Sequence, residues 1–320
     1  MSEEKNTKKD YLVKSLAYDG QLRAYAVDAT QTIATAQQKQ GTWSAATAAL
    51  GRTMVGTLLL SAAELSGDEK LTVRINGGGP VGAIVADGNA EGTVKGYLQN
   101  PHVNLPLNEK HKIDVKKAVG NKGFLAVTKD LGLKEPFTGE VPLVSGELGE
   151  DFTYYLAKSE QIPSAVGLSV FVNTDDTVGV AGGFMIQVMP GAKDEVISKL
   201  EKRLKEIPLV SKMLRDGKTP EEILYALLGK ENVKILEKMP VAFKCDCSKA
   251  RFAKGLASLP KKDIEEMIEK NHGAEAVCRF CGKKYEFSED ELKAIEAKAK
   301  DKPSAVRDKK EDSGDKKEDK

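Results

Sequence analysis

The chain has 320 residues, of which 40% are hydrophobic, and a formal net charge of +1 at pH 7. This length allows two domains and a smaller third unit. The near-neutral charge gives no electrostatic signature of binding to nucleic acid or to a membrane surface. The polar N-terminus lacks the apolar run of a secretory signal, and the longest apolar stretch, MVGTLLLSAAEL, is too short and too interrupted to span a bilayer. We therefore expect a cytoplasmic protein with no membrane or nucleic-acid partner.

The first part of the chain, residues 11–189, predicts one α+β domain built on a largely antiparallel sheet. Apolar and polar residues alternate on both sides of Asp19-Gly20, a pattern typical of a β-hairpin. Seven further segments show the same period of two and are expected to be strands. Residues 1–10, before the hairpin, are expected to form a loose polar tail.

Two helices are expected within this domain. Thr42 precedes alanines and leucines at helical spacing, and Gly67 follows them. We therefore predict a helix between these two residues, with Thr42 as its N-cap. A second helix is expected at EDFTYYLAKSE, residues 150–160.

Three glycines spell G-x-G-x-x-G after a strand: Gly77, Gly79 and Gly82. A dinucleotide-binding fingerprint requires a following helix whose N-terminus holds the pyrophosphate. Here Pro80 interrupts the loop and the sequence continues as a strand. We therefore expect a glycine turn between two strands and no cofactor-binding residues in it.

The chain has only three histidines, His102, His111 and His272. None has a Ser, Cys or Asp at the spacing of a catalytic triad, so acid–base or nucleophilic catalysis has little support. We expect these histidines to be exposed loop residues, and we predict that the protein is not an enzyme and has no catalytic residues.

The composition changes after residue 189, and segment 190–240 is expected to be a helical linker. Its first helix carries a narrow apolar stripe among Lys and Glu: Val196, Leu200, Leu204 and Ile207. Its second helix begins with a capping box of Thr219 and Glu222 and ends at Gly229. The segment buries little surface by itself, so the stripe requires a partner, either the sheet domain or the cysteine unit.

All four cysteines lie in a C-terminal unit at 241–293, as CDC (Cys245, Cys247) and CRFC (Cys278, Cys281). Two close pairs, a long spacer and a glycine after the last cysteine are a strong zinc signal, because tetrahedral zinc requires four sulfurs at about 2.3 Å from one ion. The spacer is expected to form two helices that bring the pairs together. We predict one Zn²⁺ per chain in the reduced state.

Basic residues near the cysteines are expected to offset the negative charge of a four-thiolate zinc site: Lys244, Lys249, Arg251, Arg279, Lys283 and Lys284. A closed four-cysteine site is normally structural, and that alternative stays open. However, a disulfide between the two cysteines of C-x-C would close a small, strained ring. Strained disulfides are the labile, regulatory ones. Because about 50 residues are marginally stable without a metal, oxidation and zinc loss are expected to unfold this unit.

After the cysteines, Ser288 and Glu291 are expected to start a last helix. The charged C-terminal segment, assigned to residues 294–320, has almost no apolar residues beyond Asp301 and is expected to be disordered.

The cysteine motifs KCDCSKARFAKGLASL and AVCRFCGKKYEFSEDEL resemble those of the 33-kilodalton heat-shock protein family, the redox-regulated holdase chaperones of bacteria. The upstream segments EGTVKGYL, YYLAKSEQIPSAVGLSV and GGFMIQVMPGA also resemble this family, so that the likeness covers residues 11–293. The implied architecture is an N-terminal sheet domain, a metastable linker at 190–240 and a small zinc-binding domain. The four ligands would be Cys245, Cys247, Cys278 and Cys281, and the disulfides formed on oxidation would be Cys245–Cys247 and Cys278–Cys281.

The resemblance further implies that the oxidised protein dimerises, holds unfolding client proteins without ATP, and passes them to ATP-driven chaperones. The zinc, the switch and the linker follow from the residues, whereas the chaperone role rests on the resemblance. Two alternatives are a zinc-ribbon module that binds nucleic acid and a thiol–disulfide oxidoreductase that uses Cys278 and Cys281. The second has less support, because C-x-x-C here is not next to a βαβ pattern.

Overall fold

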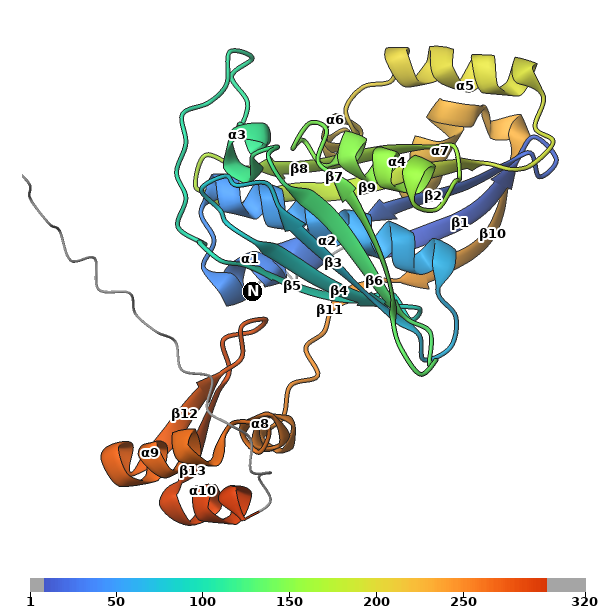
Figure 1. Cartoon of the computed structure of the whole chain (residues 1–320). Coiled ribbons are helices and arrows are strands. Elements are labelled where there is room, and N and C mark those ends of the chain that lie inside the picture. Colours follow the sequence, from blue (N-terminus) through green and yellow to red (C-terminus); the bar gives the residue numbers. More distant parts are fainter. Residues whose placement is uncertain (1–8, 298–320) are drawn as a thin grey trace, which may run out of the picture. The chain divides into compact units, whose positions relative to one another are not determined.

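The computed structural model describes residues 9–297 (Figure 1). The chain divides into two compact units, of which the first ends at Cys245 and the second begins at Asp246. Helices combined with antiparallel sheets confirm the predicted α+β class. Most of the expected N-terminal tail, and the charged C-terminal segment beyond residue 297, lie outside the described residues.

The first unit contains two sheets, where the sequence predicted one. A five-stranded sheet runs in the order β10 (Val233–Pro240), β1 (Tyr11–Ala17), β2 (Leu22–Asp28), β9 (Val178–Val188) and β8 (Ser164–Val172). A six-stranded sheet runs in the order β11 (Ala242–Phe243), β5 (Thr93–Leu98), β4 (Ile84–Asn89), β3 (Lys70–Asn76), β6 (Phe124–Asp130) and β7 (Phe137–Pro142). Neighbouring strands are antiparallel except for the short pair β11 and β5.

Helix α2 (Ser44–Glu64) lies between the two sheets and contacts strands of both (Figure 1). Its 21 residues are long and apolar enough to cross a membrane, contrary to the expectation from the sequence. However, 94% of its most apolar window is buried inside the unit, so α2 is the central core helix. The apolar side chains of α2 are thus removed from water by packing against the two flanking sheets.

The helix starts differ in detail from the predictions. Trp43, not Thr42, precedes the first turn of α2, and the Thr42 hydroxyl instead lies 2.6 Å from the Thr47 hydroxyl. The predicted helix at 150–160 is confirmed as α4 (Gly149–Lys158). Within residues 11–189 the structure adds two helices that the sequence analysis did not predict, α1 (Thr30–Gln40) and α3 (Val115–Val119).

The G-x-G-x-x-G segment is a turn between β3 and β4, as predicted. The backbone of residues 118–120 packs closely against it, and a Cβ atom on Gly77 or Gly79 would collide with carbonyl oxygens there. Glycine is therefore required by the close approach of two backbones, and no helix N-terminus is available to hold a phosphate.

The 190–240 segment forms α5 (Asp194–Glu206), α6 (Val210–Arg215), α7 (Pro220–Leu228), a 3₁₀ turn at Lys230–Asn232, and then β10. Its last eight residues are thus a strand, which corrects the expectation of a wholly helical segment. The predicted capping box at Thr219 and Glu222 is present.

The apolar stripe of α5 packs on the five-stranded sheet. Val196 and Leu200 are buried in one cluster with residues of α6, α7 and the sheet, and Leu204 and Ile207 pack against that cluster. On β1 and β2, alternate residues point to this cluster and to the main core around α2. The five-stranded sheet is therefore buried on both faces, with α5–α7 covering one and α2 the other.

The second unit combines α8 (Lys249–Leu256), α9 (Lys261–Asn271), the hairpin β12 (Gly273–Val277) and β13 (Lys284–Ser288), and α10 (Glu289–Glu296). The two spacer helices and the capping box of Ser288 and Glu291 are confirmed. Its buried hydrophobic cluster consists of five residues: Ile264, Tyr285, Phe287, Leu292 and Ile295. Such a small core provides little stability by itself.

Candidate metal centre

The four cysteines converge as the sequence predicted. The sulfurs of Cys245, Cys247, Cys278 and Cys281 all lie within 4.8 Å of one another. Among the residues that the structure describes, they form the one group of three or more potential metal-ligating side chains of Cys, His, Asp or Glu. Cys278 is buried and the other three are partly buried, so the group is shielded from water but close to the surface.

The C-x-x-C pair lies in the tight turn between β12 and β13. The amide of Cys278 donates to the Lys283 carbonyl at 2.9 Å, and the amide of Gly282 donates to the Cys278 carbonyl at 2.8 Å. Gly282 has a φ of +71°, which only glycine adopts readily. The hairpin therefore fixes the backbone that presents Cys278 and Cys281.

The C-x-C pair occupies extended chain between β11 and α8. One residue before Cys245, the amide of Lys244 donates to the Val94 carbonyl at 3.1 Å. This hydrogen bond attaches the segment before the C-x-C pair to β5. One residue after Cys247, the Ser248 hydroxyl caps α8 by accepting from the Arg251 amide at 3.3 Å. The pair is thus flanked by a backbone hydrogen bond on one side and a side-chain helix cap on the other.

The spacing of the sulfurs fits a tetrahedral ion. Ligands at about 2.3 Å from zinc lie about 3.8 Å apart. Cys247 and Cys281, which belong to different pairs, have sulfurs 3.5 Å apart. The sulfurs are therefore gathered around a single point, as one metal ion requires, and a closed set of four thiolates suits zinc.

Tyr285 on β13 is a further part of the centre that the sequence analysis did not assign. Its hydroxyl lies 3.2 Å from the Cys247 sulfur and 2.9 Å from the Cys247 carbonyl oxygen. Hydrogen bonding to Cys247, together with burial and the charge of nearby thiolates, raises the pKa of Tyr285 to about 12. At neutral pH the phenol is protonated and is able to donate a hydrogen bond to a thiolate.

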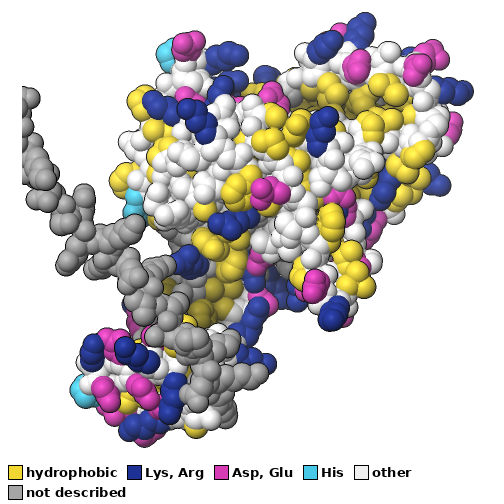
Figure 2. Space-filling model, in the orientation of Figure 1, with side chains coloured by type: hydrophobic (Ala, Val, Ile, Leu, Met, Phe, Trp, Pro, Cys, Tyr) yellow, Lys and Arg dark blue, Asp and Glu magenta, His cyan; other side chains and the backbone are white. Residues whose placement is uncertain are grey.

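Three of the six basic residues near the cysteines pair with carboxylates. Lys249 pairs with Glu291, Arg251 with Asp246, and Lys284 with Glu275. Their charge is thus shared with acidic side chains, which weakens both the expected offset of thiolate charge and a nucleic-acid-binding role. Figure 2 likewise shows Lys and Arg interspersed with Asp and Glu over the visible face.

The histidines do not contribute to the centre. His102, His111 and His272 are exposed, as predicted. His272 follows α9, and its Nδ1 lies 2.7 Å from a carboxylate oxygen of Glu289. The C-x-x-C motif lies in a hairpin turn and not at the start of a helix in a βαβ unit, which also argues against a thioredoxin-like site.

The fold and the site together define a class of protein in which a two-sheet domain is followed by a small unit with a four-cysteine centre of metal-binding type. A family model described as Hsp33 protein matches residues 10–288, and the chain belongs to this chaperone family.

Relatives cover nearly the whole chain. The 33 kDa chaperonin of Levilactobacillus brevis is 70% identical over 293 residues, which are 91% of this chain and 99% of that protein. The 33 kDa chaperonin of Latilactobacillus sakei is 67% identical over 90% of this chain and 98% of that protein. The crystal structure of the Thermotoga maritima 33 kDa chaperonin superposes with a TM-score of 0.84 at 38% identity, covering 91% of this chain and 98% of that one.

Proposed function

We propose that this protein is a redox-regulated, ATP-independent holdase that binds unfolding proteins after its cysteine centre is oxidised. The observation that carries the proposal is the convergence of four cysteine sulfurs within 4.8 Å in a unit with a five-residue buried cluster. A unit of this kind folds with its metal and loosens without it. Membership of the Hsp33 family supports the chaperone role.

In the reduced state, Cys245, Cys247, Cys278 and Cys281 would hold one Zn²⁺ as thiolates. Bound zinc supplies a cross-link between the two ends of the cysteine unit, with no redox chemistry of its own. The hydroxyl of Tyr285 donates to the Cys247 carbonyl oxygen and lies 3.2 Å from the Cys247 sulfur, so it would fix the position of this ligand. The site therefore stabilises the folded unit as long as its thiolates remain available.

Oxidation would act within each cysteine pair. Two thiols and one molecule of hydrogen peroxide give one disulfide and two molecules of water: the O–O bond breaks, the S–S bond forms, and the sulfurs lose two electrons. Formation of Cys245–Cys247 and Cys278–Cys281 leaves no thiolate to bind the ion. The cysteine unit then lacks both its cross-link and a core large enough to replace it.

The linker, which we assign to residues 190–240, would respond through the chain that leads to Cys245. Helices α5–α7 cover an apolar face of the five-stranded sheet, built by Val13, Ala24, Phe184 and Ile186 among others. When these helices detach, that face and the stripe of α5 are both exposed. Apolar surfaces of this kind bind the apolar segments that unfolding proteins expose.

The remaining parts of the proposal concern assembly and location. We propose that the oxidised protein forms a homodimer in the cytoplasm, binds clients without hydrolysing ATP, and hands them to ATP-driven chaperones after reduction. The sheet domain at 11–189 would carry dimerisation and part of the client-binding surface, and the zinc domain at 241–293 would carry the switch.

The test follows zinc and client protection in one sample. Reduced, zinc-loaded protein is treated with hydrogen peroxide at mildly raised temperature, with a chromogenic chelator and a heat-unfolding client present. We expect release of one Zn²⁺ per chain together with suppressed aggregation, and reversal by dithiothreitol. Zinc that stays bound, or that leaves without any client protection, would refute the switch.

A set of variants tests the role of the linker. Serine at Leu200, Leu204 and Ile207 removes the apolar stripe, and serine at Glu201 and Lys205 changes only the exposed face of the same helix. We expect the first set to weaken client binding by the oxidised protein and the second to leave it unchanged. If both sets of variants bound clients equally well, the apolar stripe of α5 would have no role in client binding.

A further inference from the structure

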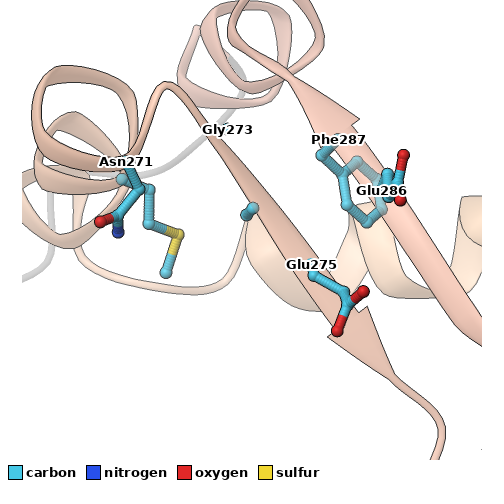
Figure 3. A pocket seen from close by; sticks show the side chains of 7 residues that line it. Asn271, Gly273, Glu275, Glu286 and Phe287 are labelled. Carbon is cyan, nitrogen blue, oxygen red and sulfur yellow. The ribbon is translucent and has the colours of Figure 1, made fainter.

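A cavity in the second unit contains a side chain that the proposed switch does not use. The cavity measures about 580 Å³ and lies beside the end of α9 and the hairpin of β12 and β13. Figure 3 shows Asn271 at the end of α9, and Gly273, Glu275, Glu286 and Phe287 on the two strands. Met267 of α9 also lines this cavity, and its thioether is the one sulfur among the lining side chains.

Met267 differs in exposure from most methionines that the structure describes. Four of them are buried in the first unit: Met54, Met185, Met213 and Met239. Met267 is only partly buried, as is Met189 just beyond the end of β9. Small neutral oxidants reach a thioether that faces an open cavity more readily than one inside a packed core.

We propose that Met267 is a second oxidant-sensitive site, whose conversion to methionine sulfoxide loosens the cysteine unit. The co-reactant is a two-electron oxidant of the peroxide or hypochlorous acid class. With hydrogen peroxide the O–O bond breaks, an S–O bond forms, the sulfur loses two electrons, and one molecule of water leaves. With hypochlorous acid the leaving species is chloride with a proton.

The sulfoxide does not fit the position that the thioether occupies. Met267 packs against the small hydrophobic cluster of the unit, and oxidation turns this apolar, flexible side chain into a polar one. The new oxygen is a hydrogen-bond acceptor, whereas the carboxylates of Glu275 and Glu286 on the cavity wall are also acceptors when ionised. Among the polar side chains on the cavity wall, Asn271 alone carries a donor, so at most this one side chain compensates the sulfoxide oxygen for the lost apolar packing.

The loosening reaches the cysteines through β13. Phe287 lines the cavity and belongs to the buried cluster, and Tyr285, two residues earlier on the same strand, belongs to it as well. Side chains two residues apart on a strand point to the same face. The hydroxyl of Tyr285 contacts the Cys247 sulfur at 3.2 Å. Disturbed packing at Met267 is thus two side chains away from the metal centre.

The first experiment maps oxidation in the intact, reduced, zinc-loaded chain. The protein is treated with limiting hydrogen peroxide or hypochlorous acid, digested, and analysed by mass spectrometry for sulfoxide at each methionine. We expect Met267 and Met189 to be oxidised before the buried Met54 and Met185. Oxidation of Met267 no faster than that of Met54 would overturn the proposal, and this readout measures neither zinc release nor client protection.

The second experiment compares Met267→Leu with Met189→Leu, which is the same change at a partly exposed methionine of the first unit. Leucine keeps the apolar volume and does not form a sulfoxide. At limiting oxidant we expect zinc release from the Met267→Leu variant to be slower by about fivefold. The Met189→Leu variant should match the wild type, and equal rates for all three proteins would refute a role for Met267.

The inference rests on the proposed zinc site only in this second readout. If the chain bound no zinc, the proposed function would fail. The loosening would then be measured by the proteolytic sensitivity of the second unit instead of by zinc release. In that case, sulfoxide at Met267 should increase cleavage within residues 246–297, and methionine sulfoxide reductase should reverse the effect. Unchanged cleavage of the oxidised protein would exclude the loosening.

Discussion

A hydrogen-bonded group holds the 190–240 segment to the first strand of the chain. The hydroxyl of Tyr11 on β1 donates to Glu221 of α7 at 2.8 Å, and Lys238 of β10 forms an ion pair with the same carboxylate. Glu221 is only 8% exposed. A hydrogen bond to a charged group contributes about 1.5–3 kcal/mol. Because Lys238 remains as a partner, we expect Tyr11→Phe to destabilise the docked segment by about 1.5 kcal/mol.

Urea unfolding of the reduced protein measures this effect, and limited proteolysis shows whether residues 190–240 become accessible first. Tyr154→Phe on α4 is the matched control, because it makes the same chemical change away from α7. A double-mutant cycle with Glu221→Gln isolates the contact between the two side chains. A coupling energy near zero would show that this hydrogen bond does not hold α7 to β1.

The same group predicts a pH dependence. Burial raises the pKa of Glu221, but hydrogen bonds from Lys238, the backbone and Tyr11 outweigh it, so the pKa lies below its ordinary value of 4.5. A carboxyl whose pKa is lowered by folding contributes stability above its unfolded pKa and loses it as the pH falls through the folded value. The stability difference between wild type and Glu221→Gln should therefore shrink below about pH 4.5.

Further substitutions test other parts of the structure. Leu200 of α5 is only 5% exposed, and Leu200→Ala should lower the free energy of unfolding in urea by about 2–4 kcal/mol. Thr219→Ala removes the N-cap of α7 and should cost about 1 kcal/mol in the same assay. Gly77→Ala places a Cβ against a backbone carbonyl of the neighbouring loop and should lower the melting temperature of the first unit in calorimetry. Cys281→Ser removes one of the four cysteines proposed to hold zinc and should abolish stoichiometric zinc binding in a chelator titration.

The elements that the sequence predicted are those with a strong local signal. Strands with a period of two and helices with a capping box, such as the start of α7 at Thr219, were placed correctly. Helix α1 was not predicted, because only Thr32, Ile33 and Ala36 are buried and its other residues, apart from one alanine, are polar. Strand β10 was missed because it is an edge strand, rich in charge and with Leu236 exposed.

The division into two sheets depends on packing that no local pattern records. Strands of both sheets have the same period of two, and only the position of α2 between them separates one sheet from the other. The candidate site shows the same limit. Cysteine spacing predicted the convergence of four sulfurs. Tyr285 contacts Cys247 although 38 positions separate them in the sequence, and only the fold of the second unit brings them together.

The arrangement of β10 and β11 indicates how the state of the cysteines would reach the linker. Strand β10 pairs with β1 from Val233 opposite Ala17 to Pro240 opposite Tyr11, with one register shift between them, and so closes the segment that contains α5–α7. Strand β11 follows with only two paired residues and leads directly to Cys245. A short parallel pair at a sheet edge is the weakest contact on this path. Loss of order at Cys245 would therefore free β11 first and β10 next, after which α5–α7 would be held to the sheet by their own apolar packing and by the contact between Tyr11 and Glu221.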